Sequence, residues 1–246
     1  MDKKTRHDLK ISGSASASGG YYNNVVVNGQ GDINGDFDCI DLKVSGTSDI
    51  EGSVKTKTGK VTGRTAIAGS LETDDFKVSG MLEVKGAVDA KELKVDGTAV
   101  IGGKLSADHL EIKGGFKAKD DCTAETFVSK GAFSVGGLLN AGNVDVVLYG
   151  PCRAKEIGGE TINVRRGNTF RLGRLINSLL FSLDLQGGLS TDTIEGDDIH
   201  LEDTKAKAVR GNNVSIGNGC DIALVEYRGK FVQSDNAKVK ESKKAR

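Results

Sequence analysis

Apolar residues and glycines recur along this chain at every seventeenth position. The most regular column is glycine, and an apolar residue stands two positions before six of its seven members. The glycine column is Gly29, Gly46, Gly63, Gly80, Gly97, Gly114 and Gly131. An apolar column in the same register is Ile33, Ile50, Ile67, Val84, Ile101, Ala118 and Val135. Columns that stay in phase over about a hundred residues are the signature of a repeat architecture.

The pattern within one unit is typical of short strands. Leu93 and Val95 are separated by one residue, and Ile101 and Leu105 follow after glycine or polar positions. Alternation with period two favours strand over helix. Each unit is therefore predicted to form three short strands joined by tight corners, where glycine fits. Because one unit cannot bury its apolar face alone, we expect an all-β parallel β-helix (β-solenoid) of about ten turns of about 17 residues.

The pattern weakens at both ends and is interrupted once, which predicts five segments. Residues 1–8 and 233–246 are polar and are expected to be disordered tails, the second one basic. Residues 9–164 are expected to form the regular solenoid, and residues 194–232 further C-terminal solenoid turns. Between them, residues 165–193 form an apolar and arginine-rich insertion.

The insertion contains an amphipathic stretch that allows three interpretations. Its apolar residues follow the spacing of a helix: Leu172, Leu175, Ile176, Leu179 and Leu183. Four arginines cluster at its start: Arg165, Arg166, Arg171 and Arg174. The stretch can lie on the flank of the solenoid as a helix or irregular strand, dock a partner protein or another filament, or bind a membrane surface. It is too short and too charged to span a bilayer.

Composition limits the partners and the compartment. The chain has 34 acidic and 34 basic residues, so no basic excess is available to displace counterions from nucleic acid. A lysine column has acidic neighbours, which favours a solvated charged face over a binding stripe for an anionic polymer. This column is Lys43, Lys60, Lys77 and Lys94. Residues 1–30 hold no apolar stretch typical of a secretory signal. The four cysteines form no CxxC pair and are interpreted as buried, reduced thiols of a cytoplasmic protein.

Candidate catalytic residues are sparse. The three histidines, His7, His109 and His200, have no serine or cysteine at a recognisable spacing. Adjacent acids such as Asp74 and Asp75 point to opposite faces of a strand, which suits neither a carboxylate dyad nor a metal site. The sequence contains no phosphate-binding GxxxxGK(S/T) motif. We therefore expect no enzyme activity, no catalytic residue, and no cofactor, metal or small-molecule substrate.

The two ends of the predicted solenoid expose unpaired backbone groups, which favours self-association. Neither end has an obvious cap in the sequence, so we expect a homopolymer that forms through both ends. The N-terminal interface is predicted at Leu9, Ile11, Tyr21 and Tyr22. The C-terminal interface is predicted at Ile222, Leu224, Tyr227 and Phe231.

The chain consists of glycine-punctuated V-x-G, I-x-G and L units, repeated at this constant spacing without signal peptide or catalytic groups. In this pattern it resembles the bactofilins, which are bacterial polymer-forming cytoskeletal proteins. The resemblance covers residues 9–164 and, more loosely, 194–227. It implies a right-handed parallel β-helix that polymerises end to end without nucleotide and scaffolds cell-shape, envelope or motility machinery, often at the membrane. The chain differs from bactofilins in its longer solenoid, its insertion at 165–185 and its lack of a hydrophobic N-terminal anchor. The alternative is a monomeric β-solenoid scaffold that docks partners or membrane through residues 165–185.

Overall fold

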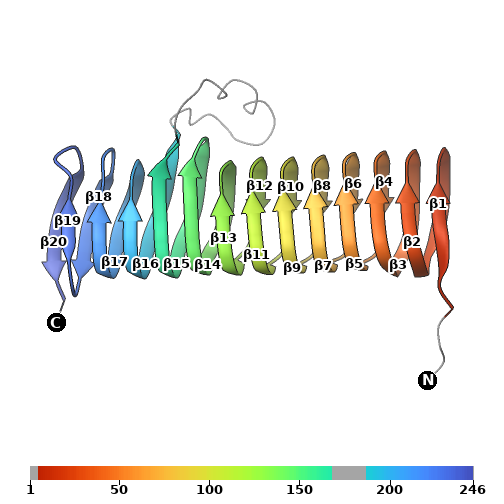
Figure 1. Cartoon of the computed structure of the whole chain (residues 1–246), viewed down its shortest axis with the longest axis horizontal. Coiled ribbons are helices and arrows are strands. Elements are labelled where there is room, and N and C mark those ends of the chain that lie inside the picture. The colour runs from red at the N-terminus through yellow and green to blue at the C-terminus, as the bar shows by residue number, and fades with distance from the viewer. Residues whose placement is uncertain (1–4, 168–186, 246) are drawn as a thin grey trace. The chain divides into compact units, whose positions relative to one another are not determined.

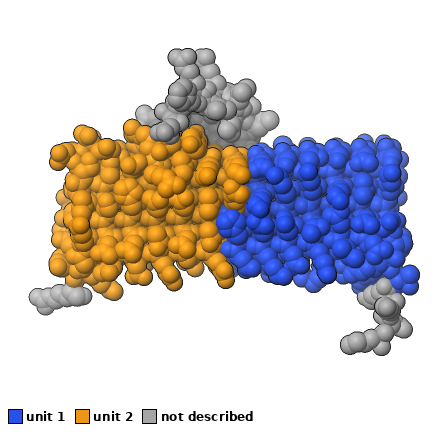
Figure 2. Space-filling model, viewed as in Figure 1, with its two compact units in different colours: residues 1–110, 117–119 blue, residues 111–116, 120–246 orange. Residues whose placement is uncertain are grey.

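The chain folds as an all-β solenoid of stacked parallel strands, which confirms the predicted fold class. The computed structural model describes residues 5–167 and 187–245, and every element within these ranges is a strand. The strands group into two compact units, residues 1–110 with 117–119 and residues 111–116 with 120–246 (Figure 2). Within each unit the strands lie side by side in the order of the chain (Figure 1).

Twenty strands are present among the described residues. The first twelve are β1 (His7–Ile11), β2 (Ser14–Val27), β3 (Gln30–Val44), β4 (Thr47–Ile50), β5 (Val54–Val61), β6 (Arg64–Ile67), β7 (Leu71–Val78), β8 (Met81–Val84), β9 (Val88–Val95), β10 (Thr98–Ile101), β11 (Leu105–Ile112) and β12 (Gly115–Ala118). The remaining eight are β13 (Cys122–Ser129), β14 (Ala132–Leu148), β15 (Pro151–Arg166), β16 (Gly188–Leu201), β17 (Thr204–Ile216), β18 (Asp221–Tyr227), β19 (Phe231–Gln233) and β20 (Lys238–Lys244).

The chain makes about 13 turns, more than the sequence suggested. Turns of irregular length explain the difference. Leu9 pairs with Val25, so the first turn is one residue shorter than the repeat. Ile199 pairs with Val214, so that turn is two residues shorter than the repeat. The number of turns therefore does not follow from dividing the chain by the 17-residue repeat.

From β3 onward, unit 1 repeats one register from turn to turn. β5 pairs with β7 so that Val54 lies beside Leu71, its counterpart in the next repeat, and both residues are buried. The glycine column lies at the corner where successive turns nearly touch. A Cβ on Gly63 would lie 1.9 Å from the carbonyl oxygen of Gly46. Close approach of the backbones therefore explains this column, since these glycines do not have a positive φ.

Unit 2 keeps the stack but changes the length of the turn. β14 and β15 pair Val144 with Ile162, so this turn is one residue longer than the repeat. β15 then pairs with β16, so that Ile162 lies beside Ile199. Residues 168–186, which lie outside the described residues, therefore fall in the chain between two strands that are neighbours in the sheet.

The insertion is narrower than predicted. β15 ends at Arg166 and β16 begins at Gly188, so the range 165–193 was too wide at both sides. Leu189 is buried there and continues the core, but polar residues around it concealed the strand in the sequence.

Both expected tails contain strand. Residues 238–244 form β20, which pairs in parallel with β18, so the prediction of a disordered tail at 233–246 is wrong there. Val239 continues the inward column beside Ile222, and one apolar residue among lysines was too weak a signal in the sequence. At the other end, β1 begins at His7, inside the expected tail of residues 1–8.

Candidate assembly interface

The first strands of unit 1 leave an edge of the sheet open. β1 pairs with β2, and the start of β2 pairs with β3. Among the described residues, no strand lies beyond β1 on its outer side (Figure 1). We call residues 9–11 of β1 and residues 14–18 of β2 the N-terminal edge. Its backbone groups on the outer side are available for pairing with another chain.

The last strands of unit 2 form a second open edge. β19 pairs with β17, and β20 pairs with β18. Within the described part of the chain, β19 and β20 are the final strands of the stack (Figure 1). We call residues 231–233 of β19 and residues 238–244 of β20 the C-terminal edge.

Inward-facing residues at both edges are only partly covered. Leu9 and Ala17 at the N-terminal edge are half-buried, and so are Phe231 and Val239 at the C-terminal edge. Their neighbours one turn further in are buried to 2% exposure or less: Val25, Ile33, Val214 and Ile222. At each edge, the last inward-facing residue of these columns therefore lacks the neighbouring turn that covers the next residue of the same column.

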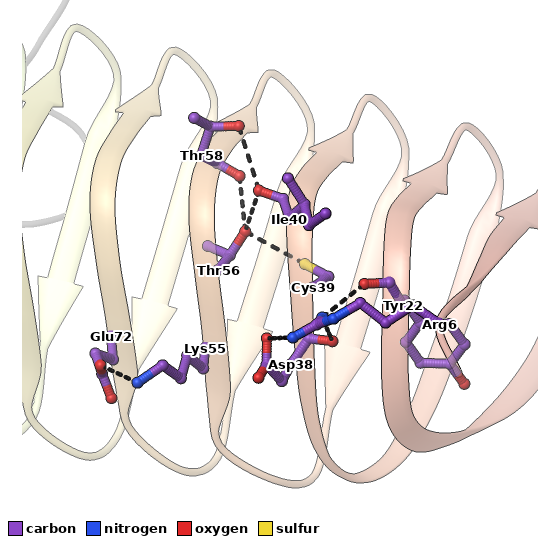
Figure 3. A network of polar contacts seen from close by, with 9 residues as sticks. All are labelled: Arg6, Tyr22, Asp38, Cys39, Ile40, Lys55, Thr56, Thr58 and Glu72. Carbon is purple, nitrogen blue, oxygen red and sulfur yellow. Dashed lines mark hydrogen bonds and ion pairs between the residues drawn. The ribbon is translucent and has the colours of Figure 1, made fainter. Parts of the chain in front are cut away.

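Arg6 closes one side of the first turn with its side chain in place of a strand (Figure 3). Its Nη1 donates hydrogen bonds to the carbonyl oxygens of Tyr22, at 2.8 Å, and Asp38, at 2.9 Å. Its Nη2 pairs with Asp38 Oδ1 at 2.9 Å. Tyr22 is buried, packs edge-to-face on Phe37 and donates its hydroxyl hydrogen to the Ser18 carbonyl at 2.5 Å. This side of the end is thus sealed by polar contacts within the chain.

The four residues predicted for the N-terminal interface therefore lie in different settings. Leu9 and Ile11 belong to the terminal strand β1, where Ile11 is buried by its own turn. Tyr21 is half-buried, with the Arg6 guanidinium 5.8 Å from its ring centroid. Tyr22 belongs to the core of the first turn.

Three of the four residues predicted for the C-terminal interface lie one strand inside the edge. β20 pairs with β18 and places Val239 beside Ile222, Glu241 beside Leu224 and Lys244 beside Tyr227. The prediction that β18 forms the open end is wrong because the lysine-rich segment after it folds onto it. The fourth residue, Phe231, does lie at the edge, and its ring stacks on Tyr227 at a centroid distance of 5.2 Å.

The two edges differ in charge. β20 carries four lysines and one glutamate, and Glu241 pairs with Lys243 at 3.0 Å. The N-terminal edge carries a single charged residue, Lys10, beside the serine and alanine residues of 14–18. Lysine on an edge strand is a common device against pairing of identical edges.

Two of the arginines predicted to dock a partner or membrane are engaged in ion pairs within unit 2. Arg165 Nη2 lies 3.0 Å from Asp145 Oδ2. Arg166 binds Asp203 with two nitrogens, at 2.5 and 2.6 Å, in a bidentate pair. The other predicted docking residues lie outside the described residues, so docking through this segment stays a prediction. They are Arg171, Arg174, Leu172, Leu175, Ile176, Leu179 and Leu183.

The lysine column of unit 1 is largely neutralised by its neighbours. Lys43 pairs with Asp41 at 2.5 Å, and Lys94 pairs with Glu92 at 2.6 Å. The hydrogen bond from Lys94 lowers the pKa of Glu92. These pairs favour the interpretation of a solvated charged face over a site for an anionic polymer.

The cysteines are buried and free. Burial raises the pKa of the Cys39 and Cys220 thiols to about 11 and that of the Cys122 and Cys152 thiols to about 12. A thiol with such a pKa stays protonated at neutral pH and is a poor nucleophile.

One histidine has a serine neighbour that the sequence spacing did not reveal. His200 Nδ1 lies 3.3 Å from Ser215 Oγ, one turn away, and its Nε2 lies 4.0 Å from Glu202 Oε1. Both distances are long for a catalytic pair. His200 and Ser215 are also paired in the sheet, where backbone N–H groups are engaged in strand pairing rather than aimed at a reacting oxygen. Among residues 5–167 and 187–245, no group of three or more His, Cys, Asp or Glu is placed to hold a metal ion.

The stacked parallel strands define the chain as a β-solenoid protein. It belongs to the family of the uncharacterized protein YhbE of Bacillus subtilis (strain 168), with 58% identity over 237 residues, 96% of this chain and 97% of YhbE. It is also similar to the uncharacterized protein YhbF of the same organism, with 39% identity over 109 residues, 44% of this chain and 42% of YhbF. No family model and no solved structure matches the chain. A search of the described residues finds no helix of the length and apolarity that a membrane span requires.

Proposed function

We propose that this chain is a bactofilin-like cytoskeletal scaffold of the cytoplasm that assembles end to end, without nucleotide, into filaments. The filaments would organise cell-shape, envelope or motility machinery, and the chain itself would carry no catalytic step. The observation that carries the proposal is the incomplete cover of the apolar columns at both edges. The resemblance of the repeat to bactofilins supplies the cellular role.

The physical argument rests on what an added turn contributes elsewhere in the same molecule. Inside each unit, a neighbouring turn covers each inward residue and pairs its backbone. Docking a second copy on an edge would complete both kinds of contact for Leu9 and Phe231, which are half-buried in the single chain. Apolar burial and strand pairing need no nucleotide, because both surfaces are already formed.

The experiment is negative-stain electron microscopy with sedimentation velocity, without nucleotide, at moderate and high salt. Thin filaments are expected from the unaltered chain. The disrupting variant is Leu9→Lys. In the free chain its long side chain can reach solvent from the half-buried position, whereas in a filament its ammonium group would be buried without a partner, which costs several kcal/mol.

The matched control is Ser106→Lys, which adds the same charge at an exposed position of β11. We expect Leu9→Lys to sediment as a single small species with an unchanged β-sheet circular dichroism spectrum, and Ser106→Lys to form filaments. A wild-type chain that stays monomeric at every concentration and salt would overturn the proposal and support the monomeric scaffold.

A further inference from the structure

One outer face of unit 2 carries positive charges that have few partners within the chain. We propose that this face binds an acidic segment of another protein in an extended conformation. The face is formed within a single chain, so this binding does not depend on the proposed self-assembly.

Strand pairing stacks the charges of this face in two columns. The first column follows the register of β15, β16, β17, β18 and β20, and it consists of Arg153, Ser190, Lys205, Asp221 and Lys238. The second column lies two residues further along the same strands, and it consists of Lys155, Asp192, Lys207, Ala223 and Lys240. Alternate residues of a strand point to the same side, so the two columns lie side by side. We call these ten residues the basic face.

The basic face has an excess of positive charge. Six of its residues are basic, and all six side chains are exposed. Within residues 5–167 and 187–245, only Lys207 among the six has an ion-pair partner, Asp192 at 2.7 Å. Asp221 is the second acid of the face, so positive charges exceed negative ones by four. Because the whole chain has equal numbers of acidic and basic residues, this excess is local.

A neighbouring column of unit 2 shows how the chain neutralises charge elsewhere. Arg210 lies between Glu195 on the preceding turn and Glu226 on the following one, at 2.7 and 2.6 Å. Opposite charges on neighbouring strands stabilise their pairing, whereas like charges destabilise it. The basic face lacks such an alternation, since its cations recur on β15, β17 and β20 with two acids between them. An acidic ligand would supply the missing negative charge.

Protection of an open edge explains only part of this pattern. β20 lies at the C-terminal edge, where lysine opposes pairing with an identical edge. β15 and β17, however, are interior strands with a paired strand on each side. They carry the same pair of cations as β20, so edge protection does not account for the basic face as a whole.

The spacing of the cations suits an extended peptide. Neighbouring strands lie about 4.8 Å apart, so the cation pairs on β15, β17 and β20 recur about every 10 Å. Three residues of an extended chain cover about the same 10 Å. A peptide that runs across these strands can therefore present acidic side chains to each pair in turn.

The acids in and around the basic face disfavour a continuous anionic surface. Asp192 and Asp221 lie between the cation pairs, and Glu156 and Glu241 are exposed directly beside the second column. A membrane surface or a nucleic acid duplex presents phosphates throughout and would face these carboxylates as well. A peptide can place neutral residues next to them, which favours a protein segment as the partner.

Fluorescence anisotropy with a labelled model peptide tests the proposal. The probe is a peptide of about twelve residues that repeats Glu-Glu-Ser, which spans the face when extended. A Gln-Gln-Ser peptide of the same length is the uncharged control. We expect the wild type to bind the glutamate peptide and not the glutamine peptide. Binding should weaken as salt rises, because exposed charges are screened.

A charge-matched pair of variants tests the location. The disrupting variant is Arg153→Ser, Lys205→Ser, Lys238→Ser, since serine already occurs in this column at Ser190. It should bind the glutamate peptide at least about tenfold more weakly, because several exposed charges that act together are removed. The control variant replaces three exposed lysines of β5 with serine and should keep the affinity of the wild type. These lysines are Lys55, Lys57 and Lys60.

Carbodiimide cross-linking, which joins carboxylates to amines as amides, identifies the lysines in contact with the peptide. We expect cross-links at Lys155, Lys205, Lys207, Lys238 and Lys240. Cross-links mainly in the lysine column of unit 1, or an equal loss of affinity in the two variants, would overturn the proposed location. Binding to vesicles of phosphatidylglycerol or to duplex DNA without binding to the peptide would overturn the peptide as partner. Absence of binding to all three probes would show that the face is only solvated.

Discussion

Phe76 occupies the space that Gly59 leaves open in the preceding turn. The two residues are partners in the pairing of β5 and β7, and a Cβ on Gly59 would lie 2.2 Å from two atoms of the Phe76 ring. In the same column, Leu42 and Leu93 fill their own turns. The smallest residue of this column and one of its two phenylalanines within residues 25–127 are therefore neighbours that complement each other in volume.

This relationship predicts strong coupling between the two positions. Gly59→Leu alone should lower the free energy of unfolding by about 3 kcal/mol, because the core around Phe76 is already filled. Phe76→Leu alone should also destabilise, because it leaves a void above the glycine. The double variant restores two leucines of ordinary size and should be more stable than either single variant. Urea unfolding followed by circular dichroism measures all three, and additive effects would contradict the packing described.

The corner glycines predict a second effect on stability. Gly63→Ala should be clearly destabilising, because its Cβ would lie 1.9 Å from the backbone oxygen of Gly46, and a backbone atom cannot move aside cheaply. Gly13→Ala is the matched control at the equivalent corner, where nothing lies within 4 Å. It should leave the monomer unchanged or stabilise it by about 0.4–1 kcal/mol through the unfolded state. Equal losses in thermal unfolding of the two variants would show that the close approach is not the cause.

Arg6 is expected to hold the first turn together. Arg6→Ala removes three hydrogen bonds, two to carbonyl oxygens and one to the Asp38 carboxylate. We expect a local loss of about 1–3 kcal/mol, visible as faster amide hydrogen exchange in β1 and at the start of β2. Lys55→Ala is the control, because its ion pair with Glu72 is exposed and such pairs contribute little. If exchange in the first turn is unchanged in Arg6→Ala, the closure by this side chain is unimportant.

The repeat made the regular part of the fold predictable from the sequence. Val54, Leu71 and Val78 stand in columns that allow one stacking register, and the slip to Ile162 could be followed because apolar residues continued on both sides of it. Position in a column also predicted burial, since alternate residues of a strand face opposite sides.

The ends were not predictable in the same way, because their contacts depend on few residues. β20 has one inward apolar residue, Val239, and its lysines suggested a solvated tail. Arg6 reaches Tyr22 and Asp38, which lie 16 and 32 residues further along the chain, and no local spacing signals such a contact. The structure places β1 at an open edge of the sheet, whereas β18 lies one strand inside the other edge.

The buried thiols predict a loss of stability at alkaline pH. Burial raises the pKa of Cys122 and of Cys152 from the ordinary 9.0 to about 12. Because a raised pKa in the folded state favours the protonated thiol, this stabilisation is fully present below about pH 9. It is lost as the pH rises towards 12, since the unfolded chain then releases protons that the folded chain retains.

Each of the two thiols should lower the free energy of unfolding by about 1.4 kcal/mol per pH unit in this window. Lysine and tyrosine also titrate there, so the informative comparison is with a Cys122→Ala, Cys152→Ala variant that keeps those groups. Between about pH 9 and 10.5, the unfolding free energy of this variant should fall less steeply than that of the wild type, and the difference in slope should be about 2.7 kcal/mol per pH unit. This holds even if the variant is less stable at neutral pH because of its smaller side chains. Parallel slopes for the two proteins would mean that the thiols ionise equally in the folded and unfolded chains. In that case the folded wild type should also react rapidly with a thiol reagent at mildly alkaline pH.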